Sequence, residues 1–376
     1  MATPGAKTRI LVVDDSAVMR SLLRTVIGTD ADLELAGVAA DGESALGLIR
    51  SARPDLVILD VEMPVMDGLT TLRAMRARNL RPPVIMCSSL TRRGAAVTVE
   101  ALAAGAADYV TKPAGQANLT QAIRTLAQDL LPKVHALTRK RNVTQLLPPI
   151  VRPADSLTPE PVGNAPSVSA TPTVVVMGVS TGGPAALDMI LPRLPAQLPL
   201  PVLIVQHMPE MFTQLLAERL DRSCKLQVVE AAEGRIVAPG TVVIARGNWH
   251  MEVLHPRAGQ APALHLSQTP LQNHCRPSVD VLFRSAAAVY GAGVLGVVLT
   301  GMGSDGLEGA RAILRQGGTI LAQDEATSAV WGMPGAVVRA GLAQRVLPLE
   351  LVAAEMIRLA GRTNREASGL REAKVS

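Results

Sequence analysis

Residues 9–16 read RILVVDDS, an apolar run that ends in two adjacent aspartates and a serine. Similar apolar runs follow at residues 33–38, 56–59, 84–87 and 107–110, and amphipathic stretches fill the gaps, the last of them from about Gln116 into the 130s. This alternation is typical of repeated βα units around a parallel sheet. The first third of the chain therefore predicts a five-stranded α/β domain.

Charged and polar side chains follow the ends of these predicted strands. Asp14 and Asp15 follow the first, Asp60 the third, Ser88 the fourth and Lys112 the fifth. The carboxyl ends of parallel strands meet at one edge of a sheet, so the carboxylates would converge and attract a hard cation such as Mg²⁺. Any one of these aspartates alone fits a helix cap or a turn equally well. Together they predict a site where Asp60 acts as a nucleophile toward phosphate.

The segments VVDDS, DVEMPVMDG, the two serines of CSSLT, and YVTKP resemble a response-regulator receiver domain over residues 7–130. The resemblance implies a flavodoxin-like fold and phosphorylation of Asp60 by a histidine kinase. It also implies that Asp15, Asp60 and the carbonyl of Glu62 hold Mg²⁺, with Asp14 nearby. The switch residues would be Ser88, Tyr109 and Lys112, although Tyr109 by itself fits a core aromatic.

A proline-rich stretch, PPIVRPADSLTPEPVGNAPSVSATP at residues 148–172, separates two α/β regions. Proline at this density disfavours helices and central strands, which indicates a semi-extended spacer. We therefore expect a receiver domain over 1–131 and a helix end with linker over 132–172. A catalytic domain would cover 173–362, and a polar, disordered tail 363–376.

The second region opens with VVVMGVSTGGPAAL at residues 174–187, an apolar strand followed by a glycine-rich turn and a helix start. Gly178, Ser180 and Gly182 satisfy the G-x-S-x-G pattern, in which a tight strand-to-helix turn exposes the serine hydroxyl. A phosphate-binding loop or a capped helix fits the same residues. Further strands are expected near residues 202–205, 226–229, 242–244, 294–299 and 319–321.

His207 and Asp305 each follow one of these strands, in VQHMP and TGMGSDG. A histidine can take the serine proton and an aspartate can orient the imidazole, so these residues predict a Ser180, His207, Asp305 triad. Asp280 and Asp324 compete for the role of the acid, and the chain holds five other histidines: His135, His250, His255, His265 and His274. The order Ser, His, Asp excludes the α/β-hydrolase fold, where the acid precedes the histidine.

The segments GVSTGGPAAL, VQHMP, CRPSVDVLF, TGMGSDG and AQDEATSAVWGMPGA resemble, in order, the catalytic domain of the CheB family of chemotaxis protein-glutamate methylesterases. The resemblance implies a Rossmann-like α/β domain that hydrolyses glutamate γ-methyl esters on methyl-accepting chemoreceptors through an acyl-enzyme and deamidates selected glutamines. It also implies that the kinase that phosphorylates the receiver is a chemotaxis histidine kinase. It implies oxyanion support from Met302, orientation of His207 by Thr181, and a cleft that the unphosphorylated receiver covers. Met302 and Thr181 fit turn packing equally well. Arg276, Pro277 and Ser278 would shape the substrate approach or form structural contacts, and the segment 331–333 could equally be core.

Composition narrows the remaining function classes. The net charge of +5 is spread along the chain apart from residues 139–141, and two Trp, two Tyr and two Phe offer few rings for stacking on bases, so nucleic acid is not an expected partner. No apolar run reaches the roughly 18 residues of a membrane span, and no secretory signal opens the sequence. We expect a cytoplasmic enzyme without membrane insertion, without disulfides and without a cofactor for the ester chemistry. The rivals are a regulator whose second domain only binds a partner, and an esterase for small metabolites.

Overall fold

The computed structural model describes residues 7–113, 118–138, 171–255 and 260–361. The chain forms two compact units, residues 1–150 and 151–376, which are described separately here. The predicted proline-rich spacer falls almost entirely outside the described residues. So do the predicted tail and the basic cluster at 139–141.

The first unit is built on a parallel sheet of five strands in the order β2-β1-β3-β4-β5. Its apolar strands are buried on both faces, which is why they read as continuous hydrophobic runs in the sequence. The predicted α/β fold with five parallel strands is confirmed. The strands are β1 (Thr8–Val13), β2 (Leu33–Ala39), β3 (Leu56–Asp60), β4 (Val84–Ser88) and β5 (Asp108–Thr111).

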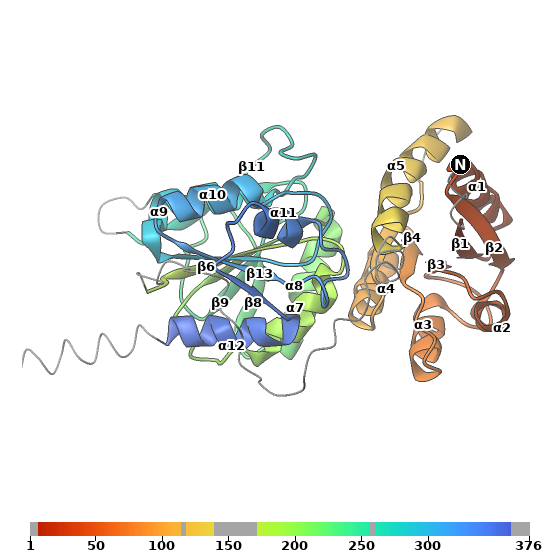
Figure 1. The fold of residues 1–376 in the computed structure, drawn as a ribbon, viewed down its shortest axis with the longest axis horizontal. Coiled ribbons are helices and arrows are strands. Elements are labelled where there is room, and N and C mark those ends of the chain that lie inside the picture. Colours follow the sequence, from red (N-terminus) through yellow and green to blue (C-terminus); the bar gives the residue numbers. More distant parts are fainter. Residues whose placement is uncertain (1–6, 114–117, 139–170, 256–259, 362–376) are drawn as a thin grey trace, which may run out of the picture. The chain divides into compact units, whose positions relative to one another are not determined.

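Helices cover both faces of this sheet. Helices α1 and α5 pack together, while α2 contacts α3 and α3 contacts α4 (Figure 1). Four of them begin at a side-chain cap, Ser16, Asp41, Asp67 or Thr91, that accepts a backbone N–H of the first turn. The helices are α1 (Ala17–Gly28), α2 (Gly42–Ala52), α3 (Gly68–Ala77), α4 (Arg92–Ala103) and α5 (Leu119–Thr138).

The second unit contains a parallel sheet of seven strands in the order β14-β13-β12-β6-β7-β9-β8. Strands β6, β7 and β12 lie next to one another, so the segments after them meet at one edge of the sheet. The strands are β6 (Val174–Val179), β7 (Val202–Gln206), β8 (Gln227–Glu230), β9 (Thr241–Ile244), β12 (Val294–Val298), β13 (Thr319–Gln323) and β14 (Arg345–Leu347).

Three strands of this unit were not expected. Strands β10 (His250–Leu254) and β11 (Ala263–Ser267) form an antiparallel hairpin outside the main sheet. Polar residues interrupt the apolar ones in both strands, so the sequence shows no continuous apolar run there. Strand β14 has only three residues and pairs with β13 at the sheet edge. Two of its three residues are exposed, so the sequence has no run of buried apolar residues there.

Helices of the second unit also form two layers. Helix α9 packs on α10, and α10 on α11, along one side of the sheet, while α7 contacts α8 and α12 on the other (Figure 1). Close helix-to-strand contact requires a glycine in β6, since a Cβ on Gly178 would collide with the Val279 side chain. The helices are α7 (Gly183–Ile190), α8 (Glu210–Ser223), α9 (Val279–Tyr290), α10 (Leu307–Arg315), α11 (Met333–Arg339) and α12 (Leu349–Ala360), with short 3-10 turns η1 (Leu191–Arg193) and η2 (Gly291–Gly293).

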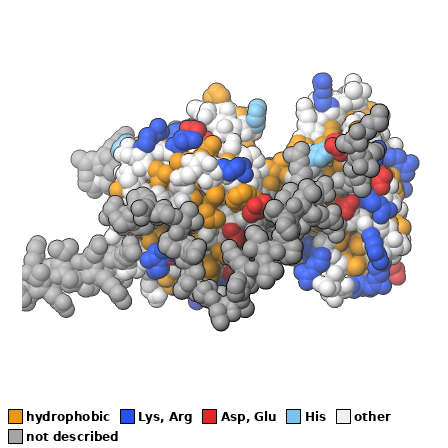
Figure 2. Space-filling model, viewed as in Figure 1, with side chains coloured by type: hydrophobic (Ala, Val, Ile, Leu, Met, Phe, Trp, Pro, Cys, Tyr) orange, Lys and Arg blue, Asp and Glu red, His pale blue; other side chains and the backbone are white. Residues whose placement is uncertain are grey.

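Charged side chains are scattered over the visible face of the molecule (Figure 2), as the even charge distribution of the sequence predicts. Figure 2 shows Lys and Arg side chains in separate groups among acidic, apolar and neutral ones on the visible face. None of the described helices is both long enough and apolar enough to span a membrane.

Candidate functional site

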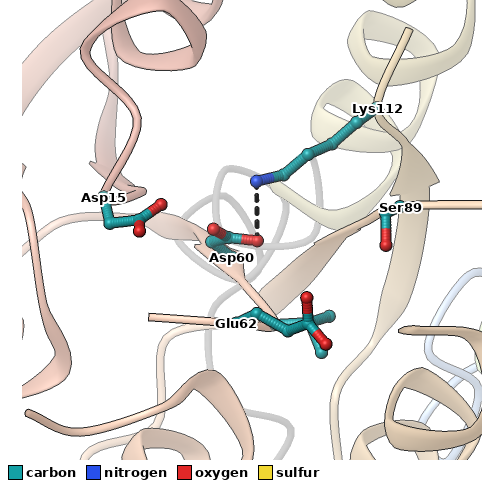
Figure 3. Close-up of a pocket in the computed structure, with 6 residues that line it drawn as sticks. Asp15, Asp60, Glu62, Ser89 and Lys112 are labelled. Carbon is teal, nitrogen blue, oxygen red and sulfur yellow. Dashed lines mark ion pairs between the residues drawn. The ribbon is translucent and has the colours of Figure 1, made fainter. Parts of the chain in front are cut away.

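The first unit carries an acidic pocket at the carboxyl edge of its sheet. Nζ of Lys112 lies 2.9 Å from Oδ2 of Asp14 and 2.8 Å from Oδ1 of Asp60. Figure 3 shows the Lys112 side chain reaching toward Asp60 across the pocket, with Asp15 on the opposite side. The strand-end residues that the sequence places apart by up to a hundred positions are therefore together in space.

The carboxylate of Asp60 is almost fully buried, at 2% exposure. Burial, with a further contribution from the charge of Asp14, raises the pKa of Asp60 to about 6, although Lys112 opposes the shift. Within the described residues, Oδ2 of Asp60 is buried and has no hydrogen-bond partner. A buried carboxylate oxygen of this kind favours a cation nearby.

The neighbouring oxygens fit a magnesium site. One carboxylate oxygen each from Asp14, Asp15 and Asp60 can be chosen so that all lie within 4.8 Å of one another. Hard oxygen ligands of this type are those Mg²⁺ prefers. The Glu62 side chain is engaged elsewhere, 3.4 Å from Nε of Arg93, and Figure 3 shows it turned away from Asp15. Glu62 would therefore contribute its backbone carbonyl rather than its carboxylate.

The other predicted switch residues lie around this pocket. Ser88 is fully buried and its hydroxyl donates to the carbonyl of Ser89, and it is Ser89 that lines the pocket. Tyr109 is buried, and Nζ of Lys133 lies 5.2 Å from its ring centroid. Burial raises the pKa of Tyr109 well above its ordinary value. The predicted roles of Ser88 and Tyr109 stay predictions.

In the second unit, Ser180 occupies the turn between β6 and α7. The backbone N–H of Ser180 donates to the carbonyl of Thr300, and the Ser180 carbonyl accepts from Gly183 N and from Nε2 of Gln206. Gly182 has φ 77°, a conformation that favours glycine, so the turn can be tight. Ser180 is partly exposed, as a nucleophile that meets an external substrate must be.

His207 directly follows β7 and contacts Asp305, which lies beyond β12. Nε2 of His207 is 2.9 Å from Oδ2 of Asp305. Burial lowers the pKa of His207, but the hydrogen bonds and charges of Asp305 and Cys275 outweigh it and raise that pKa to about 9. Asp305 is buried, which by itself would raise its pKa, yet the hydrogen bond and charge of His207, with further hydrogen bonds from Asn273 and Val279 N, lower the pKa of Asp305 to about 2. The two residues share the attraction between an imidazolium and a carboxylate, and Cys275 and the groups that donate to Asp305 add to it.

Asp305 is held in place by hydrogen bonds that sequence reasoning did not foresee. Oδ1 of Asp305 accepts from Asn273 Nδ2, the Ser278 hydroxyl and the backbone N–H of Asp280, and Oδ2 accepts from Val279 N. All of these donors lie in residues 273–280, NHCRPSVD; the family resemblance rests on the part from Cys275 onward and did not suggest this role. The sequence signal that could have indicated this role is the set of polar residues directly before the start of helix α9.

The competing carboxylates have other partners. Oδ1 of Asp280 accepts from the backbone N–H groups of Gly306 and Gly309, and Oδ1 of Asp324 accepts from Thr327. Asp280 therefore shapes the loop before α10, and Asp324 caps a local turn. Asp305 is the carboxylate that hydrogen-bonds His207 in the described residues.

The second ring nitrogen of His207 faces a cysteine. Sγ of Cys275 lies 3.7 Å from Nδ1 of His207, within hydrogen-bonding range for sulfur. In the described part of the chain, the Ser180 hydroxyl makes no hydrogen bond with His207. Nucleophile-to-base contacts are often long before a substrate binds, so this arrangement is compatible with a triad.

Residues proposed to support an oxyanion surround Ser180. Gly301 lies against it, because a Cβ on Gly301 would sit 2.8 Å from Cβ of Ser180. Met302, the next residue, is partly exposed, and among the described residues its backbone N–H has no acceptor. Thr181 is 4% exposed, and its carbonyl accepts from the Thr300 hydroxyl. Backbone donors at a glycine-rich turn beside a serine are suited to bind an oxyanion.

The remaining sequence candidates have structural contacts. The guanidinium of Arg276 donates to Asn248 and to the carbonyls of Gln268 and Thr269, so it holds loops together through hydrogen bonds. Trp331 donates to the Gln323 carbonyl and pairs with Gly301 in a bridge. The segment 331–333 therefore buttresses the strand exit next to Ser180.

Both units match known protein families. The family model for CheB methylesterase matches residues 175–356, and that for the response regulator receiver domain matches residues 10–124. A protein-glutamate methylesterase/protein-glutamine glutaminase of Nocardioides sp. is 48% identical over 93% of this chain and 94% of its own. One from Trichodesmium erythraeum is 45% identical over 94% and 99%.

Among solved structures, the CheB methylesterase catalytic domain of Thermotoga maritima is 42% identical, with a TM-score of 0.49, and covers 50% of this chain and 100% of its own. The two protein-glutamate methylesterases above are 45–48% identical to this chain over 93–94% of its length, and both family models match it. The chain therefore belongs to the CheB methylesterase family and carries a receiver domain ahead of its methylesterase domain.

Proposed function

We propose that this chain hydrolyses glutamate γ-methyl esters on methyl-accepting chemoreceptors, deamidates selected receptor glutamines, and is activated by phosphorylation of Asp60. The observation that carries the hydrolytic part is the His207–Asp305 hydrogen bond beside the Ser180 turn. Relatives of this chain are named protein-glutamate methylesterase/protein-glutamine glutaminase, which supports the same substrate class. The site of action would be the cytoplasm, where the receptor's methylated helices lie.

The tautomer of His207 determines the direction of proton transfer. Because Nε2 faces the Asp305 carboxylate, the neutral imidazole carries its proton on Nε2 and leaves the lone pair on Nδ1. Nδ1 would take the Ser180 proton as Oγ attacks the ester carbonyl, and would return it to the departing methoxide as methanol leaves. Water then attacks the acyl-enzyme by the same route and releases glutamate.

Negative charge that develops on the ester oxygen needs donors near Ser180. Our candidate is the backbone N–H of Met302, which has no acceptor among the described residues, and Thr181 would keep the turn and His207 aligned. Removing one such donor typically costs about 10²- to 10³-fold in rate. For a glutamine substrate the same steps would release ammonia instead of methanol.

Residues of the receiver domain would regulate the esterase activity. Asp14, Asp15, Asp60 and the Glu62 carbonyl would hold Mg²⁺, which when bound neutralises charge on the phosphate oxygens. Asp60 presents the buried oxygen that attacks phosphorus, and the Lys112 ammonium stabilises the acyl phosphate once formed. Phosphorylation adds about −1.5 to −2 charge, enough to bias a neighbouring loop that includes Ser88 and Tyr109.

We further propose that the unphosphorylated receiver, residues 1–131, covers the Ser180 cleft, with 132–172 as the linker and 173–362 as the catalytic domain. Deletion of residues 1–147 should then raise basal activity. A truncated protein no faster than the full chain would contradict autoinhibition while leaving the esterase assignment intact.

The decisive experiment measures methanol release from methylated chemoreceptor membranes with and without acetyl phosphate and Mg²⁺. Release should be stimulated by the phosphodonor, vanish in Ser180→Ala, and lose its stimulation in Asp60→Asn. Simple aryl esters serve as the comparison substrate. Turnover of aryl esters without receptor methyl esters would favour an esterase for small metabolites, and no turnover of either would favour a binding module.

A further inference from the structure

Cys275, which the proposed mechanism does not use, faces the active-site histidine. Its Sγ lies 3.7 Å from Nδ1 of His207, and both residues are partly exposed, so solutes can reach them. Thiolate and imidazole are the two side chains that zinc binds most readily. Whether zinc can bind both atoms depends on the distance between Sγ and Nδ1.

Tetrahedral zinc has Zn–S bonds of about 2.3 Å and Zn–N bonds of about 2.0–2.1 Å, which place the sulfur and nitrogen about 3.6 Å apart. The observed distance of 3.7 Å between Sγ and Nδ1 is close to that value. An ion could thus bridge the pair with little movement of either side chain.

The opposite side of the ring meets the second requirement of a zinc site. A histidine that binds a metal usually donates its other ring N–H to a carboxylate, which fixes the tautomer and the ring orientation. Nε2 of His207 does this with Asp305, 2.9 Å away. Asp305 is itself fixed by Asn273, Ser278 and Val279 N, so the lone pair of Nδ1 points in one direction.

The backbone at Cys275 is also fixed. Gln272 and Cys275 exchange backbone hydrogen bonds of 3.1 and 2.8 Å. Asn273 and His274 between them have φ values of 51° and 63°, which close a tight turn. The thiol is therefore presented by a short, hydrogen-bonded turn rather than by a free loop, as a prearranged ligand requires.

We propose that Sγ of Cys275 and Nδ1 of His207 form a zinc-binding site, with Asp305 orienting the imidazole and water completing the coordination. Binding displaces the thiol proton and any proton on Nδ1 into solvent. The metal occupies the lone pair that Ser180 needs, so zinc inhibits the esterase. This consequence rests on the proposed function, whereas the binding site does not.

The test combines a binding measurement with an activity measurement on the full chain. Cobalt(II), a spectroscopic substitute for zinc, is titrated in excess Mg²⁺, which competes for the oxygen ligands of the receiver. One equivalent should give a thiolate-to-metal charge-transfer absorption that zinc chloride abolishes by displacement. Cys275→Ser should lose the absorption, while Cys224→Ser, which removes another partly exposed free thiol, should keep it.

In parallel, zinc chloride should slow methyl ester hydrolysis, a chelator should restore it, and Cys275→Ser should weaken the inhibition by at least about tenfold. Absence of the absorption, or its persistence in folded Cys275→Ser, would overturn the site. Absorption without inhibition of an active enzyme would overturn the inhibitory role. If the parent hydrolyses nothing, the proposed function fails, and the cobalt titration still decides the zinc site.

Discussion

Nε2 of His207 and Oδ2 of Asp305, 98 positions apart in sequence, lie 2.9 Å from each other at the carboxyl edge of one sheet. The strands before them, β7 and β12, both flank β6, whose end carries Ser180. The bond fixes which nitrogen of the imidazole holds the proton and which carries the lone pair that can act as a base.

Replacement of Asp305 by asparagine should reduce kcat/KM by about 10⁴-fold, because an amide can reverse the tautomer while leaving the shape of the site intact. Asp280→Asn is the matched control: it changes a buried carboxylate nearby that bonds Gly306 and Gly309 instead of His207. Steady-state kinetics of ester hydrolysis would distinguish the two variants. Equal losses in both variants would indicate a loop effect rather than a triad.

The pH dependence of hydrolysis should reflect His207. Asp305 and Cys275 together raise the pKa of His207 to about 9, so the imidazole is mainly protonated at neutral pH and cannot accept the serine proton. As pH rises through that value the free base accumulates, and kcat/KM should increase up to about pH 9. A chelator is included to keep adventitious metals away. A profile already level at pH 7 would contradict the assigned base or its pKa.

Gly301→Ala should lower kcat. A Cβ at this position would press on Cβ of Ser180, 2.8 Å away, and on Sδ of Met333, so the nucleophile must shift. Displacement of about 1 Å can cost roughly 10²-fold in rate. Gly47→Ala, in helix α2 with nothing within 4 Å, is the control and should stabilise by about 0.5–1 kcal/mol without changing kcat. Unaltered kcat in a folded Gly301→Ala protein would argue against this contact.

Lys112→Met should tighten Mg²⁺ binding and abolish phosphotransfer to Asp60. The ammonium pairs with Asp14 and Asp60, so it opposes a second cation beside the same carboxylates. Its removal should increase Mg²⁺ affinity by at least about tenfold, measured by calorimetry. Lys7→Met removes an exposed cation from the same unit and should have little effect. Weaker Mg²⁺ binding in Lys112→Met would mean that the lysine organises the site instead of competing with the ion.

Local patterns predicted most of the fold. Continuous apolar runs such as 174–179 and 294–299 predicted buried parallel strands, because both faces of such strands are covered by helices. Strand β14 and the β10–β11 hairpin were not predicted, because β14 is a three-residue edge strand with two exposed residues and the hairpin lies outside the main sheet. Because Ser180, His207 and Asp305 each follow an apolar run, the sequence alone predicted that they lie at one edge of the sheet.

Sequence alone determined the class of fold, the order of the two regions and the strand-end residues, because a strand's exit carries its polar group regardless of distant contacts. Only the tertiary structure decided which carboxylate meets His207, that Asn273 and Ser278 hold it, and that Cys275 faces the other ring nitrogen. These contacts join segments far apart in the chain, and their distances depend on how helices and loops pack around the sheet.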